Sequence, residues 1–228
     1  MRAGVVVSPR GGRGPRQDMP TDSLQPAQTI EAPGVSAPPR PGVIVLARHA
    51  EPALSRKVKL TARQYADWWA LYEEGGILPG QSPPDHLKAA AARAAIICAS
   101  TRLRSVETAR ALIGSREFSQ EALFIEAPLP PPPWPGFVRL SPKTWGVVSR
   151  ISWWFGGHAG QETRPQAQAR ARVAARRLDS LAAHGGDVLV VAHGFFNTMI
   201  GLALQKRGLK KTVDQGFRYW CVKRFERP

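Results

Sequence analysis

The sequence contains only two cysteines, Cys98 and Cys221, and no Cys-x-x-Cys pair. This excludes a disulfide framework and a cysteine-based metal site, and we expect both thiols to be free in a reducing compartment. No apolar run approaches the roughly 18 residues that a membrane-spanning helix needs. The first residues are broken too early by glycine and arginine for a secretory signal. These features predict a cytoplasmic protein that needs neither a metal ion nor a cofactor.

Acidic residues are also scarce. The 17 Asp and Glu residues are outnumbered by 32 Lys and Arg, which gives a net charge of +15 over 228 residues and an isoelectric point near 11.0. A surface of this kind attracts phosphorylated metabolites, nucleic acid or acidic lipid headgroups. The net charge therefore limits the expected partners to anionic molecules, although it does not indicate a fold.

Residues 1–41 are rich in Gly, Pro, Arg and Ser and show no sustained hydrophobic period. Such a segment cannot bury enough apolar surface to offset the entropy of ordering, so it predicts a disordered leader. Met19 lies within this segment, which leaves open a later start of translation. Residues 42–228 have the length and apolar content of a single α/β domain.

Four apolar segments have the composition of strands in a parallel sheet. They are residues 43–47, 94–99, 123–125 and 187–192. Polar residues follow each of them, namely Arg48 and His49, Arg104, Glu126, and His193 with Gly194. Because parallel strands end at the same sheet edge, where open α/β proteins bind ligands, we expect these side chains to converge. Arginine and imidazole groups there suit an anionic ligand.

Helical patterns separate the strands. Thr61 followed by Gln64 forms a capping-box pattern and predicts the start of a helix. Later amphipathic or Ala-rich segments predict further helices, and residues 218–225 alternate as an edge strand does. The helical segments are residues 143–155, 163–184 and 195–205.

The motifs around the strand ends resemble those of the histidine phosphatase, or phosphoglycerate mutase-like, superfamily. Residues 46–51 are similar to its Leu-x-Arg-His-Gly-Glu opening, and residues 100–109 to its Ser-x-Leu-x-Arg-Ala-x-x-Thr-Ala segment. Residues 190–194 are similar to its second histidine motif, and the motif order is the same over about residues 42–226. The resemblance implies a three-layer α/β/α sandwich with a mostly parallel central sheet.

Two positions depart from the family pattern. Ala50 replaces the glycine after the first histidine, and Arg102 replaces the leucine of the second motif. Alanine is tolerable there unless the backbone requires a positive φ. Neither change removes a group with a chemical role.

The resemblance also implies a mechanism. His49 would attack the phosphorus of a phosphomonoester and form a phosphohistidine that water later cleaves. Arg48, Arg104 and His193 would bind the phosphoryl oxygens, and His193 would also take part in catalysis. Glu126 matches the family's acid by position and would protonate the leaving alkoxide.

Alternatives stay open at this point. Glu51 and Glu162 compete with Glu126 for the role of acid. A phosphoglycerate-type mutase would use the same phosphohistidine, and a basic module that binds nucleic acid or anionic membrane would need no catalysis. We expect a phosphorylated small molecule as the partner, because the catalytic set is intact. The substrate and the oligomeric state have no signal in the sequence.

Overall fold

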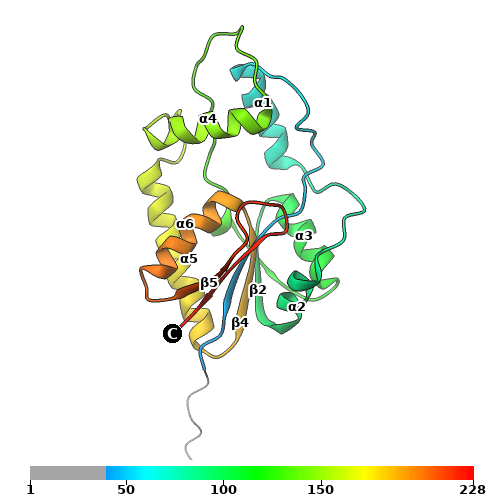
Figure 1. Ribbon diagram of the computed structural model, residues 1–228, viewed down its shortest axis with the longest axis vertical. Coiled ribbons are helices and arrows are strands. Elements are labelled where there is room, and N and C mark those ends of the chain that lie inside the picture. Colours follow the sequence, from blue (N-terminus) through cyan, green and yellow to red (C-terminus); the bar gives the residue numbers. More distant parts are fainter. Residues whose placement is uncertain (1–39) are drawn as a thin grey trace, which may run out of the picture. The chain divides into compact units, whose positions relative to one another are not determined.

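The structure is a computed structural model that describes residues 40–228 (Figure 1). The predicted leader and Met19 therefore lie outside the described residues, apart from the last two positions of the leader. The boundary between leader and domain stays a prediction.

A six-stranded sheet with the order β3-β2-β4-β1-β6-β5 forms the centre of the described part. Strands β3, β2, β4 and β1 are parallel, whereas β6 runs antiparallel to β1 and β5 antiparallel to β6. In chain order the strands are β1 (Ile44–Arg48), β2 (Ala94–Ser100), β3 (Ser119–Glu121), β4 (Asp187–Ala192), β5 (Lys210–Asp214) and β6 (Val222–Glu226). The helices are α1 (Ala62–Glu74), α2 (Asp85–Arg93), α3 (Leu103–Ile113), the 3₁₀ turn η1 (Ala122–Phe124), α4 (Pro142–Trp154), α5 (Arg164–Ala183) and α6 (Gly194–Gln205).

Helices cover both faces of the sheet (Figure 1). Since side chains alternate along a strand, Ile44 and Leu46 of β1 pack with residues of α5 and α6, while Val45 and Ala47 pack with residues of α2 and α3. The predicted three-layer α/β/α fold with a mostly parallel sheet is therefore confirmed.

Helices α1 and α4 lie together beyond the carboxyl ends of the parallel strands (Figure 1). Their contact is aromatic, with Tyr65, Trp68 and Tyr72 of α1 against Trp145 of α4. The predicted capping box at the start of α1 is present, because the side chain of Thr61 accepts from the Gln64 N–H and the Gln64 side chain accepts in return. None of the helices within residues 40–228 is both long and apolar enough to cross a membrane.

Two predictions about strands were wrong: one strand was assigned to the wrong residues, and another was assigned to the edge of the sheet. Residues 122–124 form the 3₁₀ turn η1, and the strand is instead the polar segment β3, which pairs with β2 through its backbone. The predicted edge strand within residues 218–225 is β6, which lies between β1 and β5. The edge strand is β5, whose five residues are all exposed. Because an exposed edge strand such as β5 buries neither face, its sequence shows no hydrophobic alternation from which the strand could be predicted.

Candidate active site

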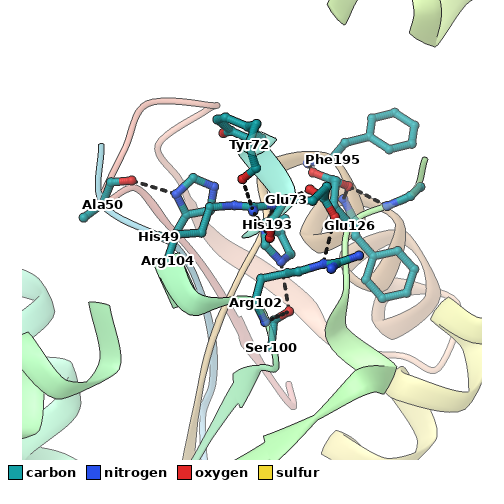
Figure 2. Close-up of polar contacts among 12 residues, drawn as sticks. His49, Ala50, Tyr72, Glu73, Ser100, Arg102, Arg104, Glu126, His193 and Phe195 are labelled. Carbon is teal, nitrogen blue, oxygen red and sulfur yellow. Dashed lines mark hydrogen bonds and ion pairs between the residues drawn. The ribbon is translucent and has the colours of Figure 1, made fainter. Parts of the chain in front are cut away.

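The carboxyl ends of three parallel strands meet at one point of the sheet edge. Arg48 in β1 is paired with Ala192 in β4, and Val191 in β4 is paired with Ala99 in β2. The next residues along these strands, His49, His193 and Ser100, therefore start the site (Figure 2).

His49 follows β1 directly and is only 2% exposed. Its Nδ1 lies 2.6 Å from the backbone oxygen of Ala50 (Figure 2). A carbonyl oxygen only accepts hydrogen bonds, so Nδ1 carries the proton and Nε2 keeps its lone pair. Burial, followed by the charges of Arg104 and Arg48, lowers the pKa of His49 well below its ordinary value. The ring is therefore neutral at pH 7, the state that a nucleophile needs.

His193 follows β4 in the same way, and its ring centroid lies 5.3 Å from that of His49. Nη2 of Arg104 lies 3.4 Å from Nδ1 of His193, which must accept because a guanidinium only donates. Nε2 therefore carries the proton and donates to Ser100 Oγ at 2.9 Å. Burial and then Arg104 lower the pKa of His193, so this ring is also neutral. To donate to a phosphoryl oxygen, Nε2 must exchange its bond with Ser100.

Arg104 of α3 has a fully buried side chain. Its Nη1 donates to the backbone oxygen of Tyr72 at 2.9 Å, and its Nη2 pairs with Glu73 Oε1 at 2.6 Å. Glu73, near the end of α1, also pairs with Nε of Arg102 at 2.8 Å (Figure 2). Contacts with Tyr72 and Glu73 of α1 thus hold the guanidinium in place beside His193, which follows β4 of the sheet.

Arg48 is held by the loop that precedes β6. Its Nη1 donates to the backbone oxygen of Phe217, and its guanidinium lies 4.6 Å from the ring centroid of Tyr219. Gly194 leaves room for this side chain, because a Cβ there would lie 3.3 Å from Arg48 Cδ. Trp220 in the same loop has a φ of 61°, a backbone strain typical of functional sites.

A third cation, Arg56, lies in the loop before α1. Its Nη2 donates to the hydroxyl of Tyr72 at 3.1 Å, and its charge contributes to the lowered pKa of His49. Within residues 40–228, the Nε atoms of Arg48, Arg56 and Arg104 are buried and have no hydrogen-bond acceptor. A buried donor without an acceptor costs about 1–3 kcal/mol. Three such donors around one neutral imidazole form a site for an anion.

Glu126 reaches the same region from the segment after η1. Its carboxylate accepts from the N–H groups of Phe196 at 2.9 Å and Phe195 at 3.2 Å, at the start of α6 (Figure 2). It also lines a cavity that includes Arg56 and Phe217. The carboxylate is thus held at the start of α6 and lines the same cavity as Arg56.

The two competing glutamates are placed differently. Glu162 makes a two-pronged ion pair with Arg170 of α5, in which both N–O distances are 2.7 Å. Glu51 is exposed, and its carboxylate makes no hydrogen bond or ion pair with the described part of the chain. Neither lines the cavity that contains Glu126. Of the three glutamates, only Glu126 lines this cavity.

Thr108 of the second motif connects the loop after β1 to α3. Its Oγ1 accepts from the N–H of Ala50 at 2.9 Å and donates to the backbone oxygen of Arg104 at 2.6 Å. Ala50 is not among the described residues with positive φ, so alanine replaces the family's glycine without strain. The motif threonine therefore fixes the loop that follows His49 relative to Arg104.

The structure brings Arg48, His49, Arg104, Glu126 and His193 to one edge of the sheet, and it places Glu51 and Glu162 outside the cavity that Glu126 lines. It also adds residues that the motifs do not contain, namely Arg56, Glu73, Phe217 and Tyr219, and it gives Ser100 of the second motif a contact with His193. Within residues 40–228, no group of three or more His, Cys, Asp or Glu side chains is arranged to hold a metal ion.

No model of a known protein family matches this chain. No curated protein matches it either. Among solved structures, it is similar to Rv3214 of Mycobacterium tuberculosis, with a TM-score of 0.51, 20% identity, and coverage of 80% of this chain and 90% of that one. Rv3214 and the present chain therefore share a fold.

Two further solved structures are similar at lower scores. Mycobacterial glucosyl-3-phosphoglycerate phosphatase Rv2419c has a TM-score of 0.49 and 18% identity, with 72% of this chain and 82% of that one covered. Phosphoserine phosphatase of Entamoeba histolytica has a TM-score of 0.47 and 15% identity, with 72% and 80% covered.

Proposed function

We propose that this protein is a histidine phosphatase, a metal-independent phosphoric monoester hydrolase that forms a phosphohistidine at His49. The observation that carries the proposal is the neutral, buried imidazole of His49 beside three arginines whose buried Nε donors have no acceptor within the described residues. The resemblance of the motifs to the histidine phosphatase superfamily supports the same assignment.

In the first step, Nε2 of His49 forms a bond to phosphorus as the bond from phosphorus to the ester oxygen breaks. Nδ1 retains its proton, and the Ala50 carbonyl stabilises the positive charge that the ring acquires. Glu126, in its acid form, transfers a proton to the departing alkoxide. Arg48 and Arg104 hold the phosphoryl oxygens through charge-assisted hydrogen bonds.

In the second step, water attacks the phosphohistidine and the bond between nitrogen and phosphorus breaks. Glu126, now a carboxylate, accepts a proton from that water and returns to its acid form. Inorganic phosphate leaves, and His49 is again neutral. The cycle needs no group from outside the chain except the ester and water.

The proposed partner is a phosphorylated small molecule that diffuses into the site. The net charge of +15 favours its approach because the surface potential attracts anions. Cys98 and Cys221 are both buried and free, which suits a reducing compartment, and we place the enzyme in the cytoplasm.

Replacement of Glu126 by glutamine tests this chemistry. Wild-type protein is expected to hydrolyse benzyl phosphate and 4-nitrophenyl phosphate in the presence of a chelator. Glu126→Gln should lower kcat/KM for benzyl phosphate by about 10²–10⁴-fold, because its alkoxide needs a proton. The same variant should lower kcat/KM for 4-nitrophenyl phosphate by less than about tenfold, since nitrophenolate leaves without help.

Glu51→Gln serves as the matched control, since it makes the same change at an exposed glutamate shortly after β1 that lies outside the cavity. It should affect both esters equally. Equal losses on both esters in Glu126→Gln would remove Glu126 from the acid role. Absence of chelator-resistant hydrolysis in the wild type would contradict the proposed function itself.

A further inference from the structure

A cavity of about 350 Å³ lies between α1 and α4, next to the proposed catalytic residues. Most of its lining is apolar or aromatic. The apolar lining residues are Tyr65, Trp68, Trp69, Leu129, Pro142, Gly146, Val147, Ile151, Phe195 and Phe217, and the charged ones are Arg56, Glu126, Lys143 and Arg150.

The aromatic wall on α1 is supported by stacking. The ring of Tyr65 lies 5.9 Å from that of Trp68 and 5.8 Å from that of Trp145, measured between centroids. The indole N–H groups of Trp68 and Trp145 are already used, because they donate to the backbone oxygens of Ser55 and Leu60. Trp68 therefore contributes hydrocarbon surface rather than a donor to the lining, and the fully buried Trp145 supports Tyr65 from behind.

The polar groups of the lining are the side chains of Arg56, Glu126, Lys143 and Arg150 and the hydroxyl of Tyr65. Glu126 and Arg56 belong to the lining, and Arg56 is near enough to His49 to lower its pKa. Arg150 is already engaged, since it donates to the backbone oxygens of Ala127 and Pro128. Its guanidinium also lies over the Phe195 ring, 3.9 Å from the centroid.

The rim of the cavity on α4 is open and apolar. Val147 and Ile151 of α4 line it and are still 57% and 56% exposed. A chain or ring that enters beside Glu126 would therefore meet apolar surface along its length. Away from the catalytic end, a hydroxylated or acidic group would find, among the described lining residues, only Lys143 and the Tyr65 hydroxyl to replace its hydration.

We propose that this cavity binds the alcohol portion of the substrate and that this alcohol carries a bulky apolar group, such as a ring system, rather than a three-carbon acid. The inference rests on the proposed phosphatase function and names its substrate class. The phosphoryl group lies among Arg48, Arg56 and Arg104, Glu126 faces the ester oxygen, and the apolar group lies between α1 and α4.

A series of primary alkyl phosphates tests this inference in the wild-type protein. Ethyl, benzyl and 2-naphthylmethyl phosphate have alkoxide leaving groups of similar kind and differ chiefly in apolar surface. We expect kcat/KM to rise at least about tenfold from the ethyl to the naphthylmethyl ester, since each buried ring adds favourable transfer energy.

Gly146→Leu narrows the cavity without an expected loss of folding. A Cβ at Gly146 would lie 3.8 Å from the Tyr65 hydroxyl, an ordinary contact, and leucine is a better helix former than glycine. The variant should lower the ratio of kcat/KM for naphthylmethyl phosphate to that for ethyl phosphate at least about tenfold. Ala70→Leu, at an exposed position of α1 outside the cavity, is the matched control and should leave the ratio at the wild-type value.

The possible results distinguish failure of this inference from failure of the proposed phosphatase function. Equal or better hydrolysis of ethyl phosphate by the wild type would overturn the inference and leave the phosphatase function intact. An unaltered ratio in Gly146→Leu would show that the apolar group binds elsewhere, which also overturns it. Hydrolysis of none of the esters would contradict the proposed function and the inference together.

Discussion

His49→Ala is expected to lower kcat for a phosphomonoester by at least about 10⁴-fold. Alanine offers no lone pair to phosphorus. Within residues 40–228 no second free imidazole nitrogen lies at this point, since both ring nitrogens of His193 have partners. The arginines would remain, so phosphate should still bind competitively in the variant. Initial rates with 4-nitrophenyl phosphate, together with binding of inorganic phosphate by calorimetry, measure both effects.

The matched control for this variant is His184→Ala. His184 follows α5, is exposed, and makes its hydrogen bond to the backbone oxygen of Ser180 within that helix end. Its removal should leave kcat within about twofold of the wild type, as is usual for surface substitutions. Activity in His49→Ala close to that of His184→Ala would exclude His49 as the nucleophile.

Arg104→Lys is expected to lower kcat/KM by about 10²–10³-fold, although the charge is retained. The guanidinium of Arg104 contacts Tyr72, Glu73 and His193 at the same time, and its buried Nε adds another donor. An ammonium group cannot make these contacts and also place a donor at the position of Nε, so a phosphoryl oxygen would lose a fixed, charge-assisted hydrogen bond in the transition state. Steady-state kinetics with benzyl phosphate test the prediction.

Arg110→Lys provides the comparison on the same helix. Arg110 is exposed and donates only to the backbone oxygens of Gly114 and Arg116. Its kcat/KM should match that of the wild type within about twofold. Similar losses in both variants would attribute the effect to α3 as a whole, and an active Arg104→Lys would remove Arg104 from phosphate binding.

The sequence predicts the centre of this site because the relevant residues follow strands that are buried on both faces. The runs before Arg48, His49 and His193 are apolar without interruption, and the parallel register brings their ends together. Arg104 could be predicted for a similar reason, since the motif around it begins where β2 ends. The apolar composition of the strands, together with the rule that parallel strands end at the same edge of a sheet, is enough to predict that these residues lie close together.

The remaining members of the site could not be predicted in this way. Arg56, Phe217 and Tyr219 lie in loops, whose backbone path depends on contacts between distant segments and leaves no periodic pattern. Glu73 lies in a helix, but its role depends on how α1 packs against α3. The short strand β3 and the exposed strand β5 were missed because backbone pairing, not side-chain burial, defines them.

The most direct test of the account is to trap the covalent intermediate. The wild-type protein is mixed with benzyl phosphate and quenched in alkali, in which phosphohistidine survives and acyl phosphates do not, and its peptides are examined by mass spectrometry. We expect phosphate on His49, lost on acid treatment and absent in His49→Ala. Phosphate on another residue, or turnover without any phosphorylated protein under these conditions, would contradict it.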